Sequence, residues 1–204
     1  TLTVSGNNVY VGGFFNDLDG VLTADYVAKW DGSVWSGLGS NGSGDGSLGS
    51  YVNAIAVNGD RVFVGGAFTN VQNVDTATLG SADHVAMWDG TNWSALGSDG
   101  ASNGSLNNTV QSLMILDNDL WAGGNFQNVN NNGNEVKEAD RLAVFGMNIE
   151  PTVTSIIRID ATPTSKKTVQ FAVTFSESVI NVDVADFLLS KTGNLSGASV
   201  TNVS

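Results

Sequence analysis

The sequence contains no cysteine, which excludes disulfide bonds, thiolate catalysis and zinc sites that depend on sulfur. Histidine is nearly absent as well, because His84 is the only one in 204 residues. Few side chains are therefore available to form a catalytic pair of nucleophile and base. We expect a protein that is not an enzyme, and the sequence assigns no catalytic, cofactor-binding or metal-binding residue. The sequence does not identify ligand-binding residues, which stay unknown.

Basic residues are few: eight Lys and Arg stand against 20 Asp and Glu, for a net charge of -12. Such a chain repels phosphate backbones, so the charge argues against nucleic acid as a partner.

No apolar run approaches the ~20 residues that a membrane-spanning helix needs, which predicts no membrane insertion. The sequence starts without Met and inside a repeat, so we expect a piece of a longer polypeptide.

The most informative feature that is present is a repeat. Residues 27–39, VAKWDGSVWSGLG, return 58 positions later as residues 85–97, VAMWDGTNWSALG. An apolar strand that ends in Gly-Gly-x-Phe occurs at residues 9–15, 62–68 and 120–126. Repeats of this length indicate an architecture built from similar units. The three copies span about residues 1–50, 51–108 and 109–147.

Each copy alternates apolar and polar residues at period two between turn residues, which predicts four antiparallel strands per unit. Asn58-Gly59-Asp60 and Asp89-Gly90 supply tight hairpin turns, because Asn and Gly tolerate a positive φ. The Gly-Gly pair removes side chains where another backbone or an aromatic ring comes close. In the second copy the predicted strands are residues 53–57, 61–65, 84–88 and 92–96.

A repeated four-stranded antiparallel unit is typical of a β-propeller blade. The Gly-Gly after the second strand, Trp30 and Trp88 in the third strand, and Trp35 and Trp93 in the fourth resemble kelch-type repeats. The fuller signature is similar to propeller-like repeats of bacterial surface proteins and of fungal cortical polarity marker proteins. The resemblance implies that residues 1–149 are part of a kelch-like β-propeller.

The third copy departs from the pattern at its end. Residues 142–146 match the third strand with Phe145 in the Trp position, but no Asp-Gly-x-x-Trp follows, so we expect the fourth strand to be missing. Three units are too few for a ring, because propellers use 4 to 8 blades. Further blades lie upstream, or one end lends a strand to the other, or the piece stands open.

The composition changes after Glu150-Pro151, with no Trp and less Gly. Residues 154–161, 167–176 and 186–190 are predicted strands, the middle one alternating from Val169 to Phe175. This segment resembles the immunoglobulin-like domains of bacterial surface proteins. Such a β-sandwich needs ~100 residues, so residues 150–204 are expected to be only its N-terminal part. The predicted fold class is all-β.

The residues at two recurring polar positions are predicted to have structural and not catalytic roles. His84 corresponds to Tyr26 and Arg141 in the other copies, so the unit does not require an imidazole there. The residue before it is an Asp in every copy, and we expect it to accept backbone N–H bonds at the turn entering the third strand. Nothing in the spacing sets these carboxylates across a substrate as glycoside hydrolysis requires. The three are Asp25, Asp83 and Asp140.

Calcium is the one cofactor that the sequence leaves open. Residues 16–20 and 128–134 have the alternating oxygen side chains and Gly of calcium loops, but neither has a Glu at the final ligand position, which favours solvated loops. Glu177, Asp183 and Asp186 offer a third arrangement in the second module.

The five Trp residues offer faces for stacking on sugar rings, but they keep the phase of the repeat, which favours packing. Trp121 stands where the other copies have Tyr10 and Phe63. The Gly-rich run at 39–50 has no Lys-Ser/Thr and no helix after it, so it is interpreted as a flexible connection and not as a phosphate site. Asn-x-Ser/Thr triplets, as at 41–43, are expected by chance here.

These features predict a non-catalytic extracellular or cell-surface module for binding or display, with adhesion implied only by the resemblance. Its partner is a protein or a glycan, recognised by loops on one face of a rigid β scaffold. Two alternatives stay open. The chain is an accessory domain of a secreted polysaccharide-active enzyme, or a structural spacer in a surface fibre.

Overall fold

The structure is a computed structural model, and it describes residues 1–74, 78–131, 134–136, 140–147, 153–160, 167–175, 179, 182–188 and 199–203. The described residues form β-strands and two short 3-10 helices, so the protein is all-β, as predicted. No helix among them has the length and apolar character needed to cross a membrane. The chain divides into two compact units, Thr1–Met147 and Asn148–Ser204.

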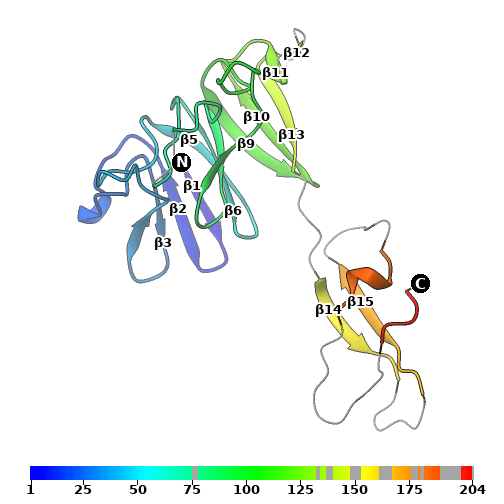
Figure 1. The fold of residues 1–204 in the computed structure, drawn as a ribbon. Helices are drawn as coiled ribbons and strands as arrows, with labels where there is room; N and C mark the ends of the chain where they lie inside the picture. The colour runs from blue at the N-terminus through cyan, green and yellow to red at the C-terminus, as the bar shows by residue number, and fades with distance from the viewer. Residues whose placement is uncertain are drawn as a thin grey trace. The chain divides into compact units, whose positions relative to one another are not determined.

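The first unit contains three antiparallel sheets that follow one another along the chain (Figure 1). The first sheet has the strand order β1-β2-β3-β4, the second β5-β6-β7-β8, and the third β13-β10-β9. The first sheet comprises β1 Leu2–Ser5, β2 Asn8–Gly12, β3 Val27–Trp30 and β4 Trp35–Gly37, with the 3-10 helix η1 Leu18–Gly20 between β2 and β3. The second comprises β5 Val52–Asn58, β6 Arg61–Gly66, β7 Val85–Trp88 and β8 Trp93–Ala95. The third comprises β9 Val110–Leu116, β10 Asp119–Gly124 and β13 Leu142–Gly146.

The four strands predicted for the second copy are confirmed within one or two residues at each end. Asn58 pairs with Arg61 across a two-residue turn, where Gly59 has a φ of 59°. Trp88 pairs with Trp93 across the second turn. There Asp89 Oδ1 accepts the backbone N–H groups of Thr91 and Asn92, which lowers the pKa of Asp89. The turn residues therefore fix the register of both hairpins.

The third sheet has three strands, as expected from its incomplete repeat. β13 is an edge strand that pairs with β10, and no fourth strand joins it within the described part of the chain. The loop before β13 corrects one prediction. Val129–Asn131 (β11) pairs with Asn134–Val136 (β12), so residues 128–134 include a two-stranded ribbon and not only a solvated loop. Residues 132–133 lie outside the described residues.

Successive sheets pack through their first strands: β5 packs against β1 and β2, and β9 packs against β5 and β6. The Gly-Gly pairs make this approach feasible. A Cβ on Gly12 would lie 2.6 Å from Val52 Cγ1 of the next sheet, and a Cβ on Gly65 would collide in the same way with Val110. A Cβ on Gly66 would collide with backbone atoms of Tyr51 and Val52. The predicted close approach at these glycines is confirmed.

The Trp residues of the second sheet pack as predicted from their phase. Trp88 and Trp93 lie across the strand pair from each other with ring centroids 5.4 Å apart, as do Trp30 and Trp35 in the first sheet. Trp93 is 2% exposed, and its Nε1 donates a 2.7 Å hydrogen bond to the backbone oxygen of Leu38. The ring thereby joins the second sheet to the end of the first.

The sheets form an open series in the described part of the chain. The second sheet contacts both neighbours, whereas the first and third sheets each have one such neighbour. Among the described residues β1 pairs with β2 and β13 pairs with β10, so neither end of the series lends a strand to the sheet at the other end.

The second unit contains a strand pair and a 3-10 helix. β14 (Val153–Arg158) and β15 (Phe171–Phe175) are antiparallel. β14 begins one residue before the first strand predicted there, and β15 lies inside the second. The third predicted strand, residues 186–190, is wrong over its described part, because Val184–Asp186 forms the 3-10 helix η2. The cause is a capping box: Asp183 accepts the N–H of Ala185, and its own N–H donates to Asp186. Residues 189–190 lie outside the described residues.

Candidate functional site

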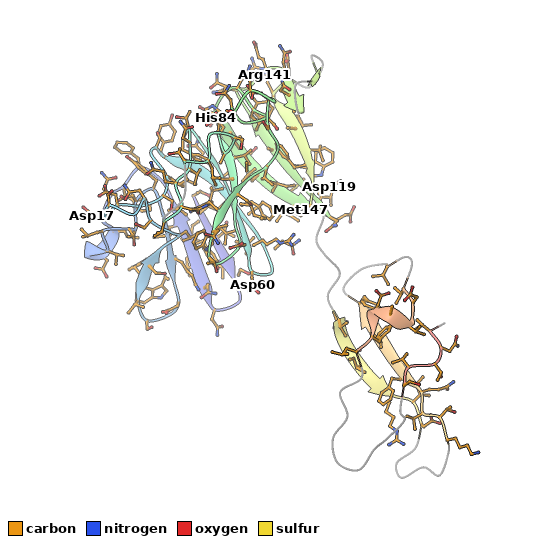
Figure 2. All side chains as sticks on the ribbon, in the orientation of Figure 1. Asp17, Asp60, His84, Asp119, Arg141 and Met147 are labelled. Carbon is orange, nitrogen blue, oxygen red and sulfur yellow. The ribbon has the colours of Figure 1, made fainter. Side chains whose placement is uncertain are left out.

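The loops of the first unit gather at the end of the sheets where the Gly-Gly pairs lie. They are the described residues between the second and third strands, within 13–26, 67–84 and 125–141 and including β11 and β12, and the connectors between sheets, residues 38–51 and 96–109. We call this end the loop face. Figure 2 shows His84 and Arg141 at this end, with Asp60 and Asp119 toward the opposite end. The loop face is where the copies differ most, and rigid strands hold it.

The position shared by Tyr26, His84 and Arg141 is strained in the same way in every copy. The three residues have φ values of 60°, 62° and 65°. Val27 and Val85 each donate an N–H to the Asp carbonyl two residues earlier, which makes the rarer γ-turn with a positive φ at its centre. A backbone conformation of this kind persists only where its surroundings enforce it.

The surroundings that enforce this turn are identical backbone hydrogen bonds. In each copy the turn residue donates its N–H to a Phe carbonyl and accepts, on its own carbonyl, the N–H of the second glycine of the Gly-Gly pair. The distances lie between 2.9 and 3.0 Å. The partners are Phe15 and Gly13 for Tyr26, Phe68 and Gly66 for His84, and Phe126 and Gly124 for Arg141. Since only backbone atoms take part, the side chain is free to change from copy to copy.

The recurring Asp carboxylates accept backbone N–H bonds, as predicted. Asp25, 8% exposed, accepts from the N–H of Asp17 and of Gly46, both at 2.9 Å. Asp83 accepts from Asn70 at 2.8 Å and Gly104 at 3.3 Å. These carboxylates therefore tie the loop before the third strand to the connector that follows the fourth. The third copy retains half of this arrangement, because Asp140 accepts from the N–H of Asn128 at 3.1 Å.

The Gly-rich run at 39–50 is not a flexible connection, so that prediction is wrong. Ser47 and Leu48 are buried, at 5% and 4% exposure. The Ser47 carbonyl accepts the N–H of Gln72 at 3.0 Å. The second connector repeats this contact, since the Ser105 carbonyl accepts the N–H of Asn130 at 2.8 Å. Each connector is thus a folded segment packed against the next sheet.

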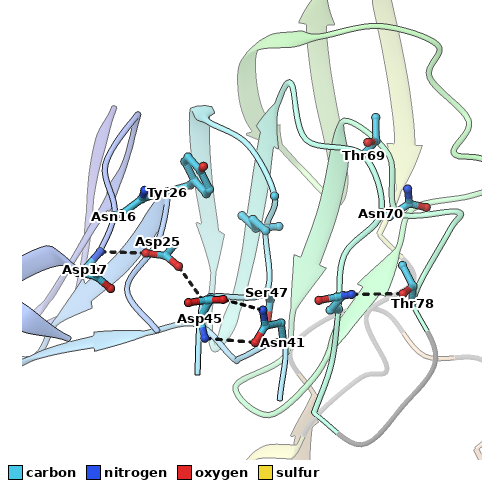
Figure 3. A pocket seen from close by; sticks show the side chains of 14 residues that line it. Asn16, Asp17, Asp25, Tyr26, Asn41, Asp45, Ser47, Thr69, Asn70 and Thr78 are labelled. Atoms are coloured by element: carbon cyan, nitrogen blue, oxygen red, sulfur yellow. Dashed lines mark hydrogen bonds between the residues drawn. The ribbon is translucent and has the colours of Figure 1, made fainter. Parts of the chain in front are cut away.

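Two polar hollows lie on the loop face, one at each junction between sheets. The first, shown in Figure 3, has a volume of ≈ 630 Å³ and the second ≈ 320 Å³. They are repeat equivalents, because most of their walls come from positions 58 residues apart. The walls include Asp25, Tyr26, Asn41, Asp45, Ser47 and Asn70 in the first hollow, and Asp83, His84, Asp99, Asn103, Ser105 and Asn128 in the second.

One residue that differs between the two hollows is the one at the strained turn. Tyr26 supplies a phenol to the first, and His84 supplies an imidazole to the second. Burial lowers the pKa of His84 below 6.5, although the Asp83 carboxylate and the backbone of Gly66 act in the opposite direction. His84 is therefore mainly neutral at neutral pH. Arg141 holds the same place on the third sheet.

Calcium was left open by the sequence, and the described carboxylates do not form a cluster for it. Among the described residues no three His, Asp or Glu side chains gather closely enough to hold a metal ion. The Asp17 and Asp19 pair in residues 16–20 lies in the η1 turn with positive φ at both residues. In the second unit Asp183 and Asp186 serve the capping box. Glu177 lies outside the described residues.

The connector residues that line the hollows were not singled out from sequence, although the signal was present. Gly46-Ser47-Leu48 recurs 58 residues later as Gly104-Ser105-Leu106. Recurrence of a buried Ser and Leu inside a Gly-rich run distinguishes a packed connector from a linker.

Comparisons with known protein families, with curated proteins and with solved structures found no match.

Proposed function

We propose that this chain is a non-catalytic binding or display module of the cell surface or extracellular space. Its first unit is part of a kelch-like β-propeller, with each sheet as a blade, and its second unit is the start of an immunoglobulin-like domain. The ligand lies on the loop face, in the repeated hollows. The observation that carries this proposal is the pair of equivalent hollows, in which a constant backbone frame presents a variable side chain at the turn before the third strand.

The chemistry of the walls favours a hydroxyl-rich glycan as the ligand. The first hollow is lined by the Asp25 carboxylate and by the side-chain amides of Asn41 and Asn70. Ser47 and Thr69 add hydroxyl groups, and Tyr26 adds an aromatic ring. Such groups accept and donate hydrogen bonds to sugar hydroxyls, while the ring offers a face for stacking. Volumes of a few hundred Å³ match the usual size of small-ligand sites.

A catalytic role receives no support from the one histidine. His84 occupies a position where the other copies have Tyr26 and Arg141. A residue that acts as a general base would need a specific partner and substrate geometry, whereas this position is defined by backbone bonds alone.

A glycan array probed with the 204-residue protein tests the proposal. Tyr26→Gly and His84→Gly are suitable variants, because glycine adopts a positive φ without strain and the backbone frame stays intact. We expect the array signal to fall in one or both variants. Arg141→Gly is the matched control, since it removes a side chain at the equivalent turn but outside both hollows. A signal that all three variants retain would contradict the proposal, and an array without any signal would favour the structural spacer.

A further inference from the structure

The first hollow is lined by carboxylates without a cationic side chain to balance them. Asp17, Asp25 and Asp45 all belong to its wall, and the described residues that line it include no Lys, Arg or His. The three carboxylates are too far apart to hold one metal ion. The wall comes from the loops and the connector at the junction of the first and second sheets, which pack on each other. A cleft with charges of one sign attracts ligands of the opposite sign.

The carboxylate of Asp17 is not needed by the backbone around it. The equivalent residues in the other copies are Asn70 and Asn128, and the three have φ values of 51°, 58° and 58°. Each donates its backbone N–H to the recurring Asp of its own copy. The turn therefore works with a neutral amide at this position. Since the Asp17 carboxylate accepts no hydrogen bond from the described residues, it is available to a ligand.

A buried hydroxyl in the same wall also lacks a partner. Ser47 lines the hollow and is 5% exposed, yet its Oγ has no hydrogen-bond partner among the described residues. Figure 3 shows Ser47 on the connector with Asn41 and Asp45. Buried polar groups are normally paired, so an exception indicates a partner from outside the chain. A ligand that donates an N–H or an O–H inside the hollow supplies that partner.

The aromatic ring of this hollow suits a cation. Tyr26 is half-buried and packs against the core, and its ring centroid lies 6.2 Å from that of Phe14. An aromatic face attracts an ammonium group that lies within about 6 Å of the ring centre. In the second hollow His84 takes the place of this ring. The first hollow is therefore the better site for a positively charged nitrogen.

We propose that the first hollow binds a glycan through a free amino group, that of a sugar that carries no acetyl group on its nitrogen. This inference rests on the proposed glycan binding at the loop face and adds the charge of the ligand. The ammonium lies among the carboxylates and the ring of Tyr26, while the amides of Asn41 and Asn70 bond to sugar hydroxyls. A lysine side chain brings the same ammonium but sets methylene groups against these amides, so the wall favours the sugar.

Isothermal titration calorimetry with two oligosaccharides of equal length tests the charge of the ligand. A β-1,4-linked glucosamine oligomer and its fully N-acetylated form have the same hydroxyls and differ at the nitrogen. At about pH 6 the free amine is protonated and the Asp side chains are ionised. We expect the 204-residue protein to bind the glucosamine oligomer and to bind the acetylated form more weakly.

Binding of the acetylated oligomer with equal or higher affinity overturns the inference but leaves the proposed glycan binding intact. If neither oligomer binds, the inference is overturned as well. The glycan array then decides separately whether the loop face binds any other sugar.

Two substitutions distinguish a seated ammonium from the general attraction between a cationic sugar and a chain with a net charge of -12. Asp17→Asn introduces the residue of the other two copies. Asp19→Asn is the matched control, because it removes the same charge from the same loop, at a φ of 55°, outside the hollow. We expect Asp17→Asn to weaken binding of the glucosamine oligomer about two- to fivefold, the range for exposed ion pairs, and Asp19→Asn to leave it unchanged. Equal losses in both variants overturn the inference.

A lysine oligomer with the same number of amino groups is the third probe, because a protein also offers an ammonium group. We expect it to bind more weakly than the glucosamine oligomer. Equally tight binding, weakened in the same way by Asp17→Asn, assigns the hollow to a protein ligand and overturns the choice of a glycan.

Discussion

Asn103 donates a 2.7 Å hydrogen bond from its side chain to the carboxylate of Asp99. In the preceding connector Asn41 donates to Asp45 at 3.2 Å, so the amide and the carboxylate have exchanged places between the copies. Asn41 Oδ1 accepts the backbone N–H groups of residues 43 and 45. Asp99 Oδ1 accepts those of residues 101 and 103 in the same way. The structure thus requires one amide and one carboxylate, and not a fixed order of the two.

This exchange predicts a rescue. Asn103→Asp places two carboxylates in contact, which destabilises the connector by repulsion of like charges. Adding Asp99→Asn recreates the arrangement of Asn41 and Asp45 and is expected to restore the melting temperature. Thermal unfolding followed by circular dichroism measures both changes at neutral pH. A double variant no more stable than Asn103→Asp alone would show that the order of the pair does matter.

Gly65→Ala tests the packing between the second and third sheets. The added methyl group collides with the Val110 side chain, and overpacking of this kind destabilises a protein by about 1–3 kcal/mol. Denaturant unfolding measures the loss. Gly123→Ala is the control at the equivalent position, because its new methyl meets only the flexible end of Ser112 and backbone of its own sheet. We expect the control to lose less stability than Gly65→Ala.

Trp93→Phe tests the hydrogen bond between the second sheet and Leu38. The substitution keeps an aromatic ring but leaves the Leu38 carbonyl without its donor, and Leu38 is 3% exposed. An unsatisfied buried polar group costs about 1–3 kcal/mol. Trp35→Phe, at the same position of the first sheet, is expected to have a smaller effect on the free energy of unfolding, since Trp35 is only partly buried. Equal losses of stability in the two variants would argue against the hydrogen bond from Trp93 to Leu38 as the cause.

His84 predicts a dependence of stability on pH. Its pKa is lower in the folded protein than the ordinary value of 6.5, so the unfolded chain binds the proton more readily. The stability due to neutral His84 is present above pH 6.5 and is lost as the pH falls below that value. Comparing unfolding at pH 7.5 and 5.5 in the unsubstituted protein and in His84→Tyr isolates the effect, because Tyr occupies this position in the first copy. The variant is expected to lose less stability over this interval.

The repeat made much of the first unit predictable from sequence. Strands of the second copy follow from alternation bounded by Asn58-Gly59 and Asp89-Gly90, and the missing strand of the third sheet follows from an absent motif. The roles of Asp25 and Asp83 followed from their recurrence before a turn. These features are local, so a pattern of a few residues is enough to specify them.

Two predictions failed, one because contacts distant in sequence decide the structure and one because a local helix cap does. Composition described residues 39–50 as a linker, but burial of Leu48 and the bond from Ser47 to Gln72 depend on the sheet that follows. In the second unit, Val184–Asp186 forms a helical turn because Asp183 and Asp186 cap it, and this capping competes with the alternation that predicted a strand nearby. The hollows are likewise formed by segments more than 20 residues apart.

The packing of each sheet only on its neighbours has a consequence for how the first unit opens. Cooperative units coupled in a line lose structure from their ends, because an end unit has one stabilising interface and a central unit has two. Amide hydrogen exchange is therefore expected to be slowest in β5–β7 and fastest in the third sheet, which has three strands and one neighbouring sheet among the described residues. The middle copy, which contacts both other sheets, would then act as the nucleus on which the terminal copies depend for their order.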